Sequence, residues 1–171
     1  MRSEFIGVTA AFGAAILLSY YAVTLTPSSR KAALGPWTTG RSDWRLRLWA
    51  IITPITAAAF VAVWYAVAFS GTVSRWPDLV VFVMFLSCAL LWSLAIIEDK
   101  QSASISAVWL TAAAACALLI VPGRTDSDLP ASLLWVAVGV VVFHHVVIDG
   151  VLWAGGIMHN RNQQVARYRN Y

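Results

Sequence analysis

Three ionisable side chains within six residues of an apolar stretch are the part of this sequence best suited to chemistry. His144, His145 and Asp149 lie in the string FHHVVIDGVLW. Ionisable groups in a membrane-length apolar segment are costly, and they usually face a bundle interior, a cavity or each other. His145 and Asp149 are four residues apart, so on an α-helix they share a face and can form a hydrogen bond or ion pair. His144 is expected to point about 100° away, towards a different neighbour.

Several interpretations of this group remain open. Imidazole suits iron, so haem ligation by one histidine is one of them. A separate metal site is not predicted, because zinc and di-iron sites need three or four well-placed ligands and the other apolar stretches supply no histidine or carboxylate at depth. The simplest interpretation is a structural polar contact between helices, in which water or a hydroxyl such as that of Ser93 supplies the hydrogen-bond partner.

The chain is also rich in tryptophan, with nine in 171 residues. Indole rings favour the interface between headgroups and acyl chains, which explains the tryptophans near the ends of apolar stretches: Trp37, Trp44, Trp49, Trp76 and Trp135. Three others fall deeper, namely Trp64, Trp92 and Trp109. An indole at depth needs a partner for its N–H, or it lines a cavity where a flat apolar ligand stacks.

The elements that must position these residues are membrane helices. The chain is 60% hydrophobic and only 12% charged, whereas soluble domains carry about a quarter charged residues. About 20 apolar residues span a hydrocarbon core as a helix. The sequence therefore predicts an all-α integral membrane protein with a single transmembrane domain, residues 1–171. It is a bundle of five helices, at about residues 5–26, 48–69, 79–97, 103–121 and 131–158.

The distribution of basic residues predicts the orientation of this bundle. The basic first loop (27–47), the third loop and the polar C-terminal tail (159–171) share one side, and together they hold nine of the twelve Lys and Arg residues. Cytoplasmic loops carry such an excess. The N-terminus is expected outside, with the first loop and the C-terminus on the cytoplasmic side of a bacterial inner membrane or an organelle membrane. The net charge of +4 then requires no nucleic-acid partner.

The architecture and several local strings resemble the translocator protein family, also called tryptophan-rich sensory proteins. That family's third span carries L-N-x-x-W-S, and here Trp92-Ser93 keeps the W-S pair while Ala89 replaces the asparagine. The family's L-N-x-x-x-W string in span five is similar to residues 148–153, which end in Trp153, with Asp149 in place of asparagine. Trp37 and Trp44 stand roughly where the family has its Pro-Trp and P-P-x-W elements, although no Pro-Pro precedes Trp44.

This resemblance implies a pocket among the five helices beneath the first loop. Members of the family are associated with binding tetrapyrroles, sterols and other flat apolar ligands, often as dimers, and enzymatic activity is not their settled role. The leading hypothesis is therefore a ligand-binding membrane protein, with haem or a porphyrin among the ligands considered. The residues expected at its site are Trp37, Trp44, Trp92, Ser93, His144, His145, Asp149 and Trp153.

Two other functional hypotheses stay open. The scarcity of soluble mass and of catalytic groups favours a non-catalytic accessory subunit of a larger membrane complex. The His-His-Asp group alone favours a membrane-embedded enzyme, which ranks last. The same string resembles the H-H-x-x-x-D-G motif of condensation-domain acyltransferases, but that family's site needs two large soluble lobes, so the match predicts no such activity.

Overall fold

The computed structural model describes residues 2–25, 44–69, 76–98 and 100–158 of the chain, and all the secondary structure in these ranges is helical. Five helices in the described part are long and apolar enough to cross a membrane: Arg2–Val23, Arg47–Phe69, Pro77–Ile97, Gln101–Ile120 and Ala131–Met158. The coarse prediction of an all-helical chain with five such helices is thereby confirmed.

The helices extend slightly beyond their apolar segments. They are α1 (Arg2–Leu25), α3 (Trp44–Phe69), α4 (Trp76–Ile97) and α5 (Gln101–Ala117), which continues as a short 3-10 helix, η1 (Leu118–Ile120). The last long helix begins as α6 (Ala131–Phe143), changes to a π-helix, η2 (His144–Ala154), and returns to α-helix up to Met158. Pro130 precedes α6, where its missing N–H costs nothing because the first donors of a helix have no intrahelical partner.

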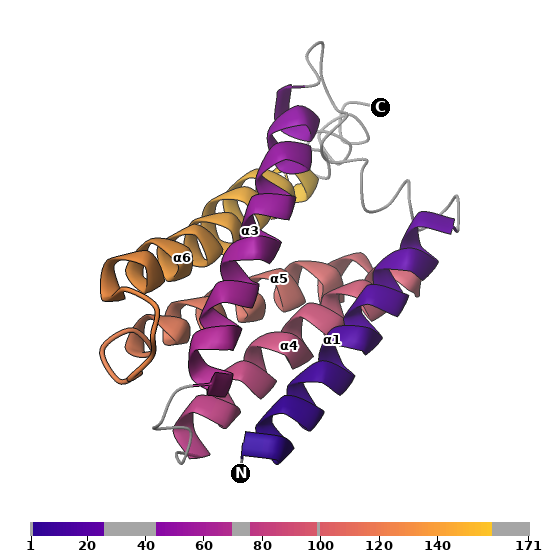
Figure 1. The fold of residues 1–171 in the computed structure, drawn as a ribbon. Coiled ribbons are helices and arrows are strands. Elements are labelled where there is room, and N and C mark those ends of the chain that lie inside the picture. The colour runs from indigo at the N-terminus through magenta and orange to yellow at the C-terminus, as the bar shows by residue number, and fades with distance from the viewer. Residues whose placement is uncertain (1, 26–43, 70–75, 99, 159–171) are drawn as a thin grey trace, which may run out of the picture.

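The bundle is arranged as a ring of neighbours. Helix α4 packs between α1 and α5, η2 packs against α5, and α6 packs against α3 (Figure 1). Helices α1 and α3 close the ring at the end that carries the N-terminus, where the Arg2 guanidinium donates to the carbonyl of Phe69. Towards their opposite ends these two helices diverge, as Figure 1 shows.

Two clusters of buried apolar side chains fill the interior. The first lies towards the N-terminal end of α1 and includes Phe5, Phe82, Phe85, Leu118 and Val141. The second lies towards the other end and includes Val23, Ile96, Val108, Ile148 and Trp153. Along the α6–η2 helix, residues 144 and 145 follow directly after the first cluster and precede the second, so the polar group lies at the boundary between them.

A hydrogen bond between side chains ties α1 to α3 within the first cluster. The Trp64 indole N–H donates to the Thr9 hydroxyl at 2.8 Å, and that hydroxyl donates to the Phe5 carbonyl at 2.6 Å. One of the tryptophans expected at depth therefore has a partner for its N–H and needs no ligand to satisfy it.

Replacing Trp64 with phenylalanine is expected to lower the free energy of unfolding by about 0.5–1.5 kcal/mol, the net contribution of one buried hydrogen bond. The free energy of unfolding is measured by adding a denaturing detergent to the protein in mild detergent and following the loss of helix by circular dichroism. In a Thr9→Val background the same replacement should cost less, because the acceptor is already gone. An equal loss in both backgrounds would show that the bond contributes nothing.

Candidate functional site

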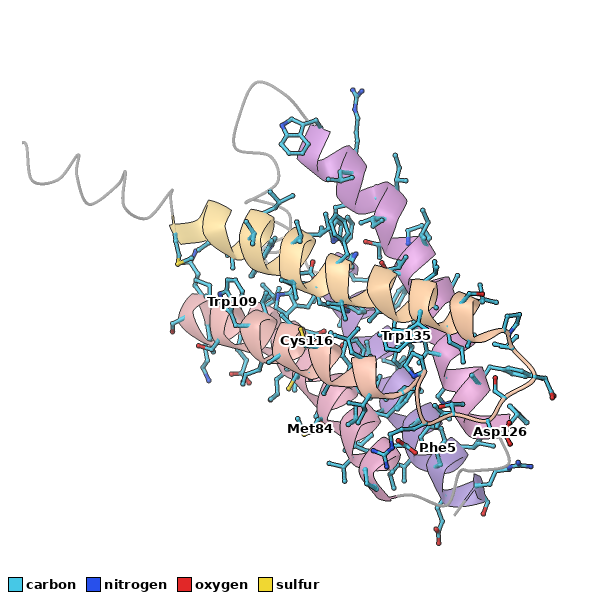
Figure 2. The ribbon with its side chains drawn as sticks, turned by 90° about the vertical axis from the view of Figure 1, so that its left-hand side faces the viewer. Phe5, Met84, Trp109, Cys116, Asp126 and Trp135 are labelled. Carbon is cyan, nitrogen blue, oxygen red and sulfur yellow. The ribbon has the colours of Figure 1, made fainter. Side chains whose placement is uncertain are left out.

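The residues singled out by their chemistry lie in the π-helical segment η2. A π-helix closes its hydrogen bonds between residues i and i+5, so residues five apart come onto one face. Such segments are rare and are frequently found at functional sites. Gly150 lies within η2 and allows close approach of α5, because the Trp109 ring occupies the space where a side chain would begin. Figure 2 shows Trp109 between α5 and the last helix.

Both histidines converge on one carboxylate oxygen. Nδ1 of His145 lies 2.9 Å from Oδ2 of Asp149, which confirms the contact expected from their spacing. Nε2 of His144 lies 3.4 Å from the same oxygen. The expectation that His144 points towards a different neighbour was wrong, because the wider turn of η2 aligns residues 144 and 149, which an α-helix would rotate apart.

This group, called here the His-His-Asp group, lies in the interior of the bundle. The side chains of His144, His145 and Asp149 are 6%, 14% and 23% exposed. The Phe85 ring of α4 packs edge-on against His145, with ring centroids 5.0 Å apart. Nδ1 of His144 is buried, and within the described part of the chain it has no hydrogen-bond partner that would fix the tautomer of that ring. One ligand atom from each residue lies within 4.8 Å of the other two, a spacing at which the three could share an ion.

Three large rings form a second group one helical turn further along, called here the aromatic group: Tyr20 of α1, Trp92 of α4 and Trp153 of η2. Trp92 lies in the middle, with ring centroids 5.5 Å from Tyr20 and 5.8 Å from Trp153. Trp153 is 2% exposed. Nε1 of Trp92 is buried and has no hydrogen-bond partner among the described residues. Trp153 follows Asp149 by four residues on η2, which connects the two groups.

The structure thus brings together five of the eight residues expected at the site: Trp92, Trp153, His144, His145 and Asp149. Ser93 is fully buried, but its hydroxyl donates to the Ala89 carbonyl of its own helix at 3.2 Å. The hydrogen bond of Ser93 thus stays within α4, whereas the contacts of Asp149 come from His144 and His145. Trp44 lies half exposed in the first turn of α3, and Trp37 falls outside the described residues.

Sequence reasoning missed Tyr20, Phe85 and the role of Trp109 beside Gly150. Phenylalanine and tyrosine in an apolar span carry no distinguishing signal, because they are common in membrane helices. Gly150 next to Asp149 was the available signal, since a glycine in a helix interior often marks a close approach of another element.

The fold and the site define the class of this protein. It is a helical protein with five helices in its described part that are long and apolar enough to cross a membrane, and the His-His-Asp group lies among them. No family model, curated protein or solved structure matches this chain. The resemblance to the translocator protein family accordingly stays a prediction from sequence.

Proposed function

We propose that this protein spans its membrane five times, with the N-terminus outside, and binds a flat apolar ligand between the aromatic group and the His-His-Asp group. The observation that carries the proposal is the buried indole N–H of Trp92, which lies in the middle of three large rings and has no partner in the described ranges. A reporter active only in the cytoplasm, fused to the C-terminus, tests the orientation, and an inactive reporter would contradict it.

The unpartnered N–H favours a ligand with a hydrogen-bond acceptor. A buried donor without an acceptor costs about 1–3 kcal/mol, and native structures rarely contain such groups without a reason. A ligand oxygen or nitrogen beside Nε1 of Trp92 would recover that free energy. The rings of Tyr20 and Trp153 meet Trp92 at interplanar angles of 53° and 73°, and together the three rings offer the aromatic surface that a planar ligand would contact.

The exposure of Tyr20 suggests how a ligand enters. Tyr20 covers one side of Trp92 and is itself 38% exposed, on a helix that fits the lipid phase. Rotation of this side chain towards the lipid would open a lateral path to Trp92 without unfolding a helix. A lipid-soluble ligand dissolved in the bilayer arrives from that direction.

The His-His-Asp group sets the polarity expected of the ligand. Asp149 precedes Trp153 by four residues on η2, so a ligand stacked on Trp153 would place one edge near the carboxylate and the imidazoles. The ligand class is therefore a planar ring compound with a polar edge, such as a tetrapyrrole or a sterol-like lipid.

Titration of the purified protein in lipid nanodiscs with protoporphyrin, following tryptophan fluorescence, is expected to give saturable quenching. The Trp92→Phe variant should bind about tenfold more weakly, because the loss of one hydrogen bond of about 1.4 kcal/mol corresponds to that factor. Trp135→Phe is the matched control, since Trp135 is half exposed near the start of α6, away from both groups. Equal affinity of the Trp92→Phe variant and the wild type would contradict the proposal.

A further inference from the structure

We propose that His144, His145 and Asp149 form a binding site for a divalent transition-metal ion of the Zn²⁺ or Fe²⁺ type. This inference does not rest on the proposed ring ligand, because it uses the donor atoms of the His-His-Asp group alone.

The geometry of the three donors is close to that of a metal site. Ligand atoms bound at about 2.1 Å to a tetrahedral or octahedral ion stand about 3.0–3.5 Å apart. Here the two nitrogen–oxygen distances are 2.9 and 3.4 Å, and all three donor atoms lie within 4.8 Å of one another. Small rotations of the side chains would therefore place one ion at bonding distance from all three. The π-helix makes this possible, because it aligns residue 144 with residue 149 while residue 145 stays beside them.

The types of donor select the class of ion. Two imidazoles and one carboxylate are the protein ligands of many zinc enzymes and of non-haem iron sites. Both kinds of site keep coordination positions open for water or a substrate. Magnesium and calcium are disfavoured, since they prefer oxygen ligands throughout. The unpartnered Nδ1 of His144 can carry the ring proton, which leaves the Nε2 lone pair free to face the ion.

The charge of the site also favours a bound cation. None of the five apolar stretches, residues 5–26, 48–69, 79–97, 103–121 and 131–158, contains a lysine or arginine. Among the described residues, the basic partners of Asp149 are therefore His144 and His145. A bound divalent cation would compensate the charge of an ionised Asp149 directly, and low-dielectric surroundings strengthen that attraction.

Metal binding can be measured on the full chain carrying an affinity tag without histidines. The protein in mild detergent is treated with a chelator, titrated with Co²⁺ as a spectroscopic substitute, and freed of unbound ion. We expect about one Co²⁺ per chain by elemental analysis, with d–d absorption bands that disappear when Zn²⁺ displaces it. Elemental analysis of protein purified anaerobically without chelator then identifies whether zinc or iron occupies the site in cells.

Variants decide whether the ion is held by these residues. Asp149→Asn keeps the size and a hydrogen-bonding group but removes the anionic ligand, and it should lower the retained Co²⁺ at least tenfold, as should His144→Phe. Asp78→Asn is the matched control, because Asp78 is another buried carboxylate, at the far end of α4; it should retain the ion.

Circular dichroism shows whether each variant is folded. If a single replacement prevents folding, the variant with apolar residues at positions 144, 145 and 149 is tested for Co²⁺ retention instead. A folded wild type that retains no Co²⁺, or folded variants that retain as much as the wild type, would overturn the proposal. Porphyrin quenching is a separate readout, so failure of the metal site and failure of the ring-ligand site are distinguishable.

Discussion

Replacing Asp149 with leucine is expected to destabilise the bundle by about 3–5 kcal/mol, the usual cost of removing one partner from a buried ionic group. Both histidines make their contact with the same oxygen, Oδ2 of Asp149. A single replacement therefore leaves two imidazoles without an acceptor in the bundle interior, and each unsatisfied group costs about 1–3 kcal/mol.

A triple variant shows whether the group exists for stability. Replacing His144 and His145 with phenylalanine together with Asp149→Leu removes every partner at once, and such apolar exchanges are often neutral or stabilising. We expect this variant to recover most of the stability that Asp149→Leu loses, as measured by denaturing-detergent unfolding with circular dichroism. If the triple variant were as unstable as the single one, the group would be a structural requirement, and its presence would not indicate a function.

Replacing Gly150 with leucine is expected to cost about 1–3 kcal/mol by overpacking and to displace the site. A Cβ atom at this position would lie 3.1 and 3.2 Å from Cζ3 and Cη2 of Trp109, and 3.3 Å from the His145 carbonyl oxygen. The indole can move by a few tenths of an ångström to accept an alanine. A leucine requires α5 and η2 to separate, and Asp149 is the adjacent residue.

Matched variants separate overpacking from other effects of losing a glycine. Gly139 lies in α6, and a Cβ atom added there would meet no neighbouring atom within 4 Å. Gly139→Leu should therefore leave the unfolding free energy unchanged or slightly raise it through better helix propensity. Trp109→Ala should rescue Gly150→Leu by vacating the space. The idea fails if Gly150→Leu unfolds at the same detergent fraction as the wild type, or if Trp109→Ala gives no rescue.

The helical architecture was predictable because it follows from properties that are local in sequence. Apolar runs of about 20 residues with no internal charge, as in residues 79–97, can satisfy their backbone in lipid only as helices. The pairing of His145 with Asp149 was equally local, since residues four apart share a face of any regular helix.

The composition of the site was predictable only in part, because ring contacts depend on which helices are neighbours. Trp92 and Trp153 lie about 60 positions apart in the chain, and nothing in either segment specifies that α4 and η2 bring them to 5.8 Å. Trp64 and Trp92 were equivalent in sequence, as deep indoles. In the part of the chain that the structure describes, Thr9 accepts from the N–H of Trp64, and the N–H of Trp92 has no acceptor.

For this protein the sequence by itself determined the five apolar helices and the presence of two histidines and an aspartate in the last of them. The tertiary structure decided that His144 joins His145 on Asp149 and that Trp92, which is partly buried, lies between Tyr20 and Trp153. The physical reason is that hydrophobic length and i, i+4 spacing are properties of one helix. The π-helical register, by contrast, accompanies the packing of η2 against α5, where Trp109 of a different helix meets Gly150.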